Sequence, residues 1–416
     1  MAKRPSKLAV AWTAGRLAGR RLLRRSVGDA DLELGDHLAA QLDEMKGLAM
    51  KMGQIVSYME IPLPDAVQDR LARLQTGQRG MPADAVRQAI EASMGAALEQ
   101  CFSTFELEPV AAASIGQVHR ARVDDQPVAV KIQYPDVASS FDNDLRGVSR
   151  LASLASLASA VDGQAIAREL GERLAEECDY LREAQMQAAF AAAFADDPTI
   201  AIPEVVTSHC RANLLTTRWV DGIDFARLRD EGSEELRNAI AQTLVRFSYR
   251  SLLVLGAIQA DPHPGNFLFG DDERVTFLDF GCVRTFEPDF VLALRQLIVA
   301  VRDQSPAAAR QAADALGLVG RPRKFDDAHF FAMVEHLHRP LLHDGFTFER
   351  SYMHEAVAFN GPTNPNARAM AIPPAYMWVS RLQWGLWAIL TKLGVRGSFA
   401  AITEQLLEQP IALLQP

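Results

Sequence analysis

Cysteine is scarce in this sequence of 416 residues. The four cysteines, Cys101, Cys178, Cys210 and Cys282, are widely scattered and form no paired spacing. Structural zinc sites and disulfide frameworks are recognised by paired or regular cysteine spacings. The cysteine pattern therefore argues against both and is typical of a reducing compartment.

Long apolar runs are missing as well. The sequence has no window of about 20 uncharged apolar residues, the length that a helix needs to cross a bilayer. The start of the chain has only short apolar runs, which argues against a secretory signal peptide. We therefore expect no transmembrane helix and a cytoplasmic location.

Positive charge is concentrated at one end of the chain. The formal net charge is -9, yet the first 28 residues contain eight Lys or Arg and no acid. The acidic remainder does not suit a nucleic-acid-binding protein, so we expect no nucleic-acid partner. Residues 8–28 have the pattern of a basic amphipathic helix, which predicts contact with an anionic membrane surface. A solvated, frayed start of the chain is the alternative.

The hydrophobic period divides the chain into helical and strand-rich parts. Apolar residues recur every three or four positions in the helical parts and alternate in the strands. The helices expected from this pattern cover 31–60, 83–94, 137–195, 236–255 and 376–393. The strands expected cover 102–110, 117–122 and 128–134, with a strand and turn over 214–223.

Four segments follow from these changes of period. Residues 1–30 form a basic amphipathic segment and 31–100 a helical extension. Residues 101–215 form a small lobe with strands, and 216–416 form a larger lobe with a helical C-terminal part. The predicted fold class is α+β with two lobes, and an apolar share of 49% is ample for a core.

The stretch 260–281 carries the strongest chemical signal. Asp261 is followed five residues later by Asn266, and an Asp-Phe-Gly triplet begins at Asp279. The apolar runs around Gly-Asp-Asp-Glu predict a β-hairpin with Asn266 and Asp279 at its opposite ends. Protein kinases place a catalytic Asp, a metal-binding Asn and a metal-binding Asp-Phe-Gly at these spacings. We therefore predict Asp261 as a catalytic residue, and Asn266 and Asp279 as Mg²⁺ ligands.

A second set of residues suits nucleotide phosphates. Lys131 lies in an apolar Val-Ala-Val-Lys strand, which in kinases supplies the lysine that contacts the α- and β-phosphates. An edge-strand lysine facing solvent is the alternative. The segment between the strands expected at 102–110 and 117–122 holds one glycine only, but its backbone amides can still bind phosphates. Its residues are Ala111, Ala112, Ala113, Ser114, Ile115 and Gly116.

Carboxylates cluster shortly afterwards, at Glu177, Asp179 and Glu183. We expect one of them to pair with Lys131, and the sequence leaves Glu177 and Glu183 open as the partner. The surplus carboxylates favour a second cation on the nucleotide side, either Mg²⁺ or Lys51. An acidic helix face in solvent is the alternative.

Six motifs, taken in order, resemble the UbiB family of atypical kinases, which is linked to coenzyme Q biosynthesis. They are Lys-Met-Gly-Gln (51–54), Ala-Ala-Ala-Ser-Ile-Gly-Gln-Val-His (111–119), Val-Ala-Val-Lys-Ile-Gln-Tyr-Pro (128–135), Glu-Cys-Asp-Tyr-Leu-Arg-Glu-Ala (177–184), Asp-Pro-His-Pro-Gly-Asn-Phe (261–267) and Leu-Asp-Phe-Gly (278–281). The resemblance implies a bilobal protein-kinase-like fold whose N-terminal helical extension covers the peptide site. It also implies that Lys51 and Gln54 face that site, that Lys51 lies near Glu177 and Asp179, and that Ala113 biases nucleotide preference.

Two features of peptide-phosphorylating kinases are missing. Gln259-Ala260-Asp261 replaces His-Arg-Asp, and a helical pattern follows Gly281 too soon for an activation segment with Ala-Pro-Glu. A site without a peptide platform can still hydrolyse ATP and drive a conformational cycle. We therefore predict an atypical kinase-like ATPase that uses ATP and Mg²⁺ and assists ubiquinone or isoprenoid-lipid metabolism at the inner face of a bacterial membrane.

Two other functions stay open at this point. One is a phosphotransferase acting on a protein or a small metabolite, which requires an open pocket at Asp261. The other is a nucleotide-gated scaffold, which would tolerate the loss of Asp279. The expected partners are ATP or ADP, an anionic membrane surface, isoprenoid-quinone precursors and quinone-biosynthesis proteins.

Overall fold

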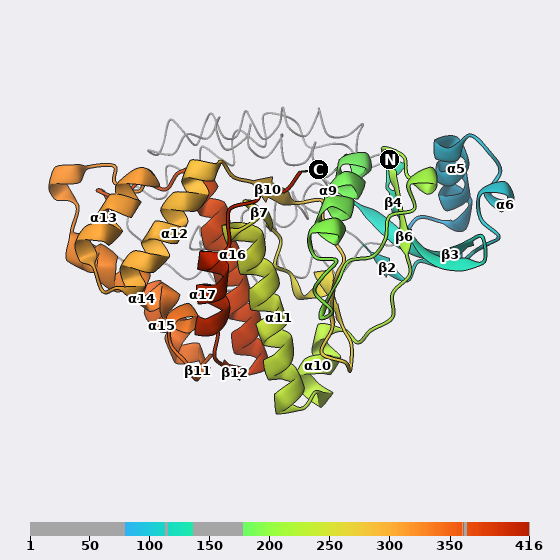
Figure 1. The fold of residues 1–416 in the computed structure, drawn as a ribbon. Helices are drawn as coiled ribbons and strands as arrows, with labels where there is room; N and C mark the ends of the chain where they lie inside the picture. The colour runs from blue at the N-terminus through green and yellow to red at the C-terminus, as the bar shows by residue number, and fades with distance from the viewer. Residues whose placement is uncertain (1–79, 113–114, 136–177, 360, 362–363, 416) are drawn as a thin grey trace, which may run out of the picture. The chain divides into compact units, whose positions relative to one another are not determined.

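The computed structural model describes residues 80–112, 115–135, 178–359, 361 and 364–415 (Figure 1). The predicted helices before residue 80 lie outside the described residues, as do five of the predicted site residues: Lys51, Gln54, Ala113, Ser114 and Glu177. The chain forms two compact units. Unit 1 runs to Arg182 and includes Val206–Trp219, whereas unit 2 comprises Glu183–Val205 and Val220–Pro416.

Unit 1 is built on an antiparallel sheet. Its strands are β1 (Thr104–Phe105), β2 (Ala111–Ala112), β3 (Gly116–Val123), β4 (Gln126–Gln133) and β6 (Leu214–Arg218). The order is β1-β3-β4-β6, and β2 pairs with β3. Asp124 and Asp125 join β3 to β4 with φ values of 47° and 57°. Two successive positive φ values suit the tight hairpin that follows the right-handed twist of the strands.

The prediction of one strand over 102–110 is wrong in extent. Only the short strand β1 forms there, and Ala111–Ala112, expected as loop, pairs with β3 as β2. Phe102 still ends the short helix α6 (Leu98–Cys101) by donating its N–H to Leu98 O. Pro109 has no N–H to donate to a ladder, so continuous pairing is interrupted before β2.

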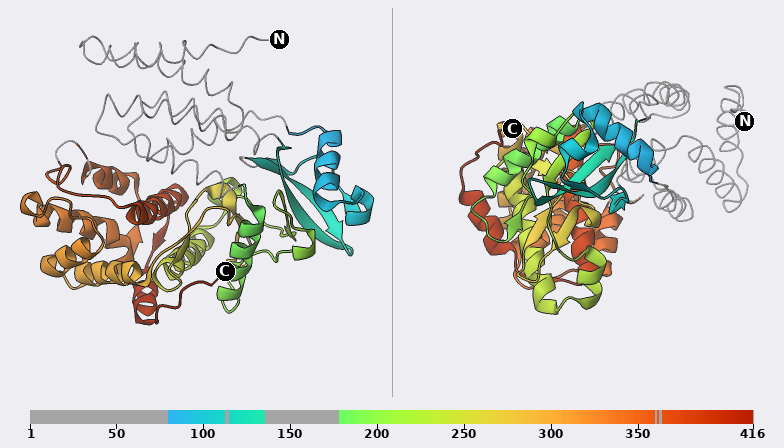
Figure 2. Two further views of the ribbon diagram at one scale, coloured as in Figure 1. Left: turned by 90° about the horizontal axis from the view of Figure 1, so that it is seen from above. Right: turned by 90° about the vertical axis from the view of Figure 1, so that its right-hand side faces the viewer.

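Helix α5 (Ala83–Met94) covers the sheet of unit 1, as Figure 2 shows. The prediction of a helix over 83–94 is confirmed. Val86 and Ile90 are one turn apart and fully buried, and they pack with Phe102 and Ile132 in the core of this unit. Gly95 ends the helix in the left-handed region at φ 73°, where a residue without Cβ is favoured.

Three hydrogen bonds cross the interior of unit 1. Met81 N donates to Gln117 Oε1 at 2.7 Å, Gln117 Nε2 lies 2.7 Å from His119 Nε2, and His119 Nδ1 lies 2.8 Å from Glu106 O. An amide nitrogen only donates and a carbonyl only accepts, so His119 must carry its proton on Nδ1 and be neutral. Both side chains are fully buried. Burial therefore lowers the pKa of His119.

Unit 2 is mainly helical. Its helices include the end of α9 (Tyr180–Ala193), followed by α10 (Phe225–Glu231), α11 (Glu234–Leu253), α12 (Pro288–Arg302), α13 (Pro306–Ala315), α14 (Asp327–Leu342), α15 (Arg350–Phe359), α16 (Pro374–Leu393) and α17 (Ala400–Glu408). Figure 1 shows α11, α16 and α17 side by side. Among the residues described, no helix combines the length and the apolar character that crossing a bilayer requires.

Short strands complete this unit. They are β5 (Ile200–Ala201), β7 (Ala257–Gln259), β8 (Phe267–Phe269), β9 (Val275–Phe277), β10 (Val283–Thr285), β11 (Phe346–Thr347) and β12 (Arg396–Gly397). Single 3-10 turns lie at Pro264–Asn266 and Pro322–Lys324 here, and at Thr207–His209 in unit 1.

Helix α11 begins shortly before the predicted start at residue 236. Ser233 caps it by accepting the N–H of Leu236, and Glu234 and Glu235 lie in the first turn, where acids favour a helix. Phe247 on its buried face stacks on Phe277 with ring centroids 3.6 Å apart. The helix therefore packs against the hairpin strands that lie between the predicted metal ligands Asn266 and Asp279.

Helix α16 corresponds to the apolar helix expected over 376–393. Trp387 is fully buried, and its Nε1 donates to Leu337 O at 3.3 Å. A buried indole that finds a carbonyl acceptor is well placed in a core. The helix thus completes the core of unit 2.

Folding stability is expected to fall on acidification because of His119. Its pKa in the folded protein is lowered by burial, so the unfolded chain binds a proton more readily. This contribution to stability is complete above the ordinary histidine pKa of about 6.5 and is lost as the pH falls below that value. Thermal unfolding of the wild type and of His119→Gln, at about pH 7.5 and about pH 5.5, measures it.

His119→Gln should lose part of the pH dependence of folding stability. Burial also lowers the pKa values of His336 and His338 in α14, so both proteins keep some acid sensitivity. The quantity to compare is the change in Tm between the two pH values. An equal change in both proteins would refute the role of His119.

Candidate active site

The segment 260–266, called the Asp261 loop, lies between two short sheets of unit 2. Strand β7 leads into it, and β10 pairs with β7 so that Gln259 lies opposite Val283. Ala260 N donates to Cys282 O at 2.8 Å. The residues before Asp261 and those after Gly281 are therefore held together by backbone hydrogen bonds.

The predicted hairpin is present as β8 and β9. Phe267 lies opposite Phe277, and Leu278 N donates to Asn266 O at 3.0 Å. These contacts close the open end of the hairpin. Asn266, the residue before β8, therefore lies beside Leu278, the residue before Asp279.

Asn266 and Asp261 contact each other directly. Asn266 Nδ2 lies 3.0 Å from Asp261 O and 3.3 Å from Asp261 Oδ2, and it donates to both. His263 N also donates to Asp261 O, at 2.7 Å. Because Asn266 uses its amide nitrogen on Asp261, its amide oxygen is the atom suited to a metal ion.

The Asp279 backbone is held by a buried glutamine. Gln259 is 4% exposed, and its Nε2 donates to the main-chain carbonyl of Asp279. This bond joins the strand before Asp261 to the Asp-Phe-Gly triplet. The sequence places Gln259 where kinases have the His of His-Arg-Asp, but nothing in the pattern of residues predicts its partner.

Carboxylate oxygens converge at Gly281. Asp279 Oδ1 accepts the N–H of Gly281 at 2.9 Å. A Cβ at Gly281 would lie 3.3 Å from Asp279 Oδ1 and 3.3 Å from Glu183 Oε2. Glu183 is 2% exposed, and buried carboxylates need a cation or hydrogen-bond donors. The glycine therefore leaves space for two acidic side chains at one point.

Arg381 is a site residue that the sequence did not reveal. It extends from α16, and its Nη2 lies 2.8 Å from Asp261 Oδ1. Its helix is otherwise almost entirely uncharged, with Lys392 as the other charged residue. A lone arginine in an apolar helix could have signalled a buried acidic partner, but not which one.

Lys131 lies in the interior of the unit 1 sheet. Strand β4 runs between β3 and β6, with Lys131 opposite Val118 and Leu215. The alternative of an edge-strand lysine is therefore wrong. Its ammonium lies 4.9 Å from the centre of the Tyr180 ring, within the range of a cation–π interaction.

The described part of the predicted phosphate loop is tightly bound to β4. Ile115 is buried, and its carbonyl accepts the N–H of Tyr134 at 2.9 Å. A Cβ on Gly116 would collide with the Ile132 carbonyl oxygen. The single glycine of the loop therefore permits close approach of two strands.

Asp179 begins helix α9. Its Oδ1 accepts the N–H groups of Leu181 and Arg182, each at 3.1 Å. This capping contact satisfies two of the unpaired donors at the helix start. A role of Asp179 toward the nucleotide stays a prediction, as do the roles of Ala111, Ala112, Ile115 and Gly116.

Residues 73–312, more than half of the chain, match the family model of the ABC1 atypical kinase-like domain. The chain belongs to this family. The resemblance to the UbiB atypical kinases, the kinase-like α+β class and the assignment as an atypical kinase-like protein are thereby confirmed.

Several proteins named atypical kinases are similar over much of this chain. "Atypical kinase COQ8, mitochondrial" of Saccharomyces cerevisiae is 34% identical over 280 residues, which cover 65% of this chain and 55% of the yeast protein. "Atypical kinase COQ8B, mitochondrial" of Rattus norvegicus is 32% identical over 305 residues, which cover 72% and 58%. This chain spans about half the length of the curated relatives it matches.

A solved structure is also similar. It is the complex of Rv3197 with erythromycin from Mycobacterium tuberculosis, with a TM-score of 0.71 and 30% sequence identity. The likeness covers 94% of this chain and 100% of that one. The likeness therefore includes residues of both units.

The Asp261 loop and the Asp-Phe-Gly triplet offer oxygen atoms of the kind that bind Mg²⁺. Such an ion takes its remaining ligands from phosphates and water. Asp279 and Asn266 supply a carboxylate and an amide oxygen from adjacent segments. Within the described ranges, no group of three His, Cys, Asp or Glu side chains is arranged to hold a metal by itself. Mg²⁺ usually takes one or two carboxylates and completes its shell with waters and substrate phosphates. The residues present therefore fit the ion.

Substitution of Gln259 is expected to lower catalytic activity more than folding stability. Gln259→Ala deletes the bond to the Asp279 carbonyl, and one hydrogen bond contributes about 1 kcal/mol. We expect ATP turnover to fall about fivefold, because about 1.4 kcal/mol of barrier corresponds to a tenfold change in rate. Steady-state ATP hydrolysis and Tm measure the two effects.

Gln304→Ala is the matched control. Gln304 also donates to a main-chain carbonyl, that of Val301 at 3.1 Å, but it lies after α12 and outside the Asp261 loop. Its substitution should leave turnover unchanged. Equal activities of the two variants would show that the Gln259 bond does not support the site.

Proposed function

We propose that this protein is a Mg²⁺-dependent, kinase-like ATPase that assists ubiquinone or isoprenoid-lipid metabolism at a membrane surface. The observation that carries the proposal is the joined set of Asp261, Asn266 and Asp279 in unit 2. Asn266 contacts Asp261 through its side chain and Leu278 through its backbone. The segments that carry these three residues are therefore joined by hydrogen bonds, which supports the proposal.

The short segment after Gly281 favours hydrolysis over peptide phosphorylation. Strand β10 begins at Val283 and helix α12 at Pro288. A peptide kinase places a long activation segment ending in Ala-Pro-Glu at this point. This chain has no length for it, which supports ATP chemistry without a docked peptide.

The proposed division of labour follows from the atoms available. Asn266 Oδ1 and the Asp279 carboxylate would hold Mg²⁺, which neutralises charge on the β- and γ-phosphates when bound. Asp261 would accept a hydrogen bond from the attacking water and orient it. Lys131 and the amides of 111–116 would bind the remaining phosphate oxygens.

Two parts of this proposal are carried by the family resemblance. One is the ion pair of Lys131 with Glu177 or Glu183, and the other is the covering of the site by Lys51 and Gln54. Tyr180 supports Lys131 within unit 1, because its ring contacts the ammonium.

The link to lipid metabolism is proposed from the relatives and from the N-terminal sequence. The yeast and rat proteins are named mitochondrial atypical kinases of the COQ8 type. The eight basic residues at the start of this chain suit an anionic bilayer. We propose the inner face of a bacterial membrane as its location, with isoprenoid-quinone precursors and quinone-biosynthesis proteins as partners.

We expect the protein to hydrolyse ATP in the presence of Mg²⁺. We also expect the rate to increase when anionic liposomes and a quinone-headgroup mimic are added. Asp279→Asn should abolish the Mg²⁺-dependent rate, and Asp261→Asn should lower it about a hundredfold, as loss of a positioned acid or base does. Asp303→Asn, at an exposed aspartate paired with Arg302, is the control. Release of phosphate measures each rate.

The outcome also separates the rival functions. Labelled phosphate on a protein or small metabolite from cell extract would establish a phosphotransferase. Nucleotide binding without turnover, together with full cellular function of Asp279→Asn, would establish a scaffold. Absence of both turnover and ADP binding in every condition would refute the proposed ATPase.

A further inference from the structure

Helix α16 contacts the Asp261 loop at two successive turns. Arg381 and Gly385 are four residues apart and share one face of the helix. Arg381 reaches Asp261, and Gly385 lies against Pro262. Both lie outside residues 73–312, the part of the chain that matches the family model.

Gly385 is required by this contact. A Cβ there would overlap the Pro262 ring at Cγ and lie 3.1 Å from its Cβ. Because Gly385 has no side chain, the Pro262 ring packs directly against the backbone of α16. This contact fixes the position of the residue that follows Asp261.

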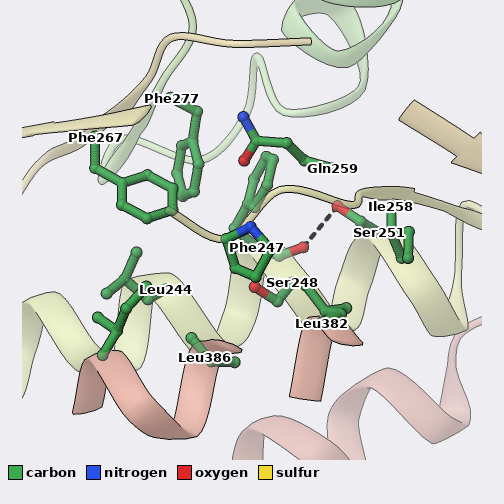
Figure 3. Close-up of a pocket in the computed structure, with 12 residues that line it drawn as sticks. Leu244, Phe247, Ser248, Ser251, Ile258, Gln259, Phe267, Phe277, Leu382 and Leu386 are labelled. Atoms are coloured by element: carbon green, nitrogen blue, oxygen red, sulfur yellow. Dashed lines mark hydrogen bonds between the residues drawn. The ribbon is translucent and has the colours of Figure 1, made fainter. Parts of the chain in front are cut away.

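The same helix closes the space beneath the loop. Figure 3 shows Leu382 and Leu386 facing Ser248 and Gln259 across a small cavity. Its volume is about 10 Å³, close to the smallest space that holds one water molecule. Pro262 also lines it. Helix α16 thus packs against the Asp261 loop.

Both carboxylate oxygens of Asp261 have a donor. Oδ1 accepts from Arg381 Nη2 at 2.8 Å, and Oδ2 accepts from Asn266 Nδ2 at 3.3 Å. Opposed donors prevent rotation of the carboxylate. His263, two residues after Asp261, is exposed, and its Nδ1 accepts the N–H of Gly265 at 3.0 Å. Among the residues that the structure describes, the cation paired with Asp261 is therefore Arg381 of α16.

The guanidinium is itself held by an aromatic ring. Arg381 lies 5.5 Å from the centre of the Trp378 ring, and Arg284 lies 4.8 Å from the same ring. Arg284 belongs to β10, which follows the Asp-Phe-Gly triplet. Trp378 consequently contacts an arginine from each of the two segments that adjoin the site.

We propose that Arg381 is a positioning residue that sets the orientation of the Asp261 carboxylate, so that catalysis depends on the C-terminal helix α16. This inference rests on the proposed ATPase function. The side chains of Arg381 and Asp261 are 19% and 28% exposed. Because this ion pair is mostly buried, Tm is measured for each variant together with its rate. A large loss of rate with the fold retained then reports on orientation.

Steady-state ATP hydrolysis by the full chain tests the proposal. Arg381→Ala should lower kcat about tenfold or more, with KM for MgATP within about twofold, because nucleotide contacts are untouched. Arg381→Lys should be intermediate, since it keeps the charge without the planar fork. Free guanidinium should restore part of the rate to Arg381→Ala but not to Arg381→Lys.

Arg227→Ala is the control for an exposed arginine. Arg227 forms an ion pair with Glu231 on α10, and its substitution should leave kcat unchanged. Gly385→Ala provides an independent variant that keeps Arg381 but displaces Pro262. Like Arg381→Ala, this variant should lower kcat.

Hydrogen exchange supplies a measurement that does not need turnover. The amides of His263 and Asn266 donate within the loop, to Asp261 O and His263 O. They should exchange faster in Arg381→Ala than in the wild type, with α12 unchanged. If the wild type hydrolyses no ATP, the proposed function fails while this measurement still judges Arg381.

Two results would overturn the inference. One is an Arg381→Ala protein with wild-type kcat and wild-type exchange in the Asp261 loop. The other is a loss of rate that follows a lower Tm or weaker ADP binding, which would show a structural or binding role instead.

Discussion

The hydrogen bond from the buried Gln259 amide to the Asp279 carbonyl is the contact on which the segments with the predicted metal ligands depend. It joins the strand that ends at Gln259, just before Asp261, to the triplet that begins at Asp279. The β7–β10 pairing and the closure of the β8–β9 hairpin on Asn266 reinforce the same junction. Because buried polar groups are costly when unpaired, this junction has one well-defined arrangement.

The support beneath that junction comes from far along the chain. Helix α11 provides Phe247, which stacks on Phe277, while α16 provides the surface that meets Pro262 and Asp261. Asp261, Asn266 and Asp279 thus lie in loop segments next to short strands, with long helices packed against these strands. Such an arrangement places the reacting groups on a loop that a rigid scaffold supports.

Much of the local structure was predictable because its causes are local. The helix over 83–94 follows from apolar residues spaced for one face, with a glycine at its end. The hairpin between Asn266 and Asp279 follows from two apolar runs around a turn. The strand over 102–110 was overestimated, since Pro109 and the end of α6 interrupt pairing there. Periodicity cannot show such interruptions by itself.

The order of the motifs and the family assignment follow from the amino-acid sequence, as do the types of side chain proposed to bind ATP and Mg²⁺. Spacing along one segment carries this information, because neighbours in the chain share a strand or a turn. The folded structure was needed to show that Lys131 lies in a central strand, that Gln259 bonds to Asp279, and that Arg381 contacts Asp261. Arg381 is separated from Asp261 by 120 residues. Contacts over such distances arise from packing of whole elements, which no local pattern encodes.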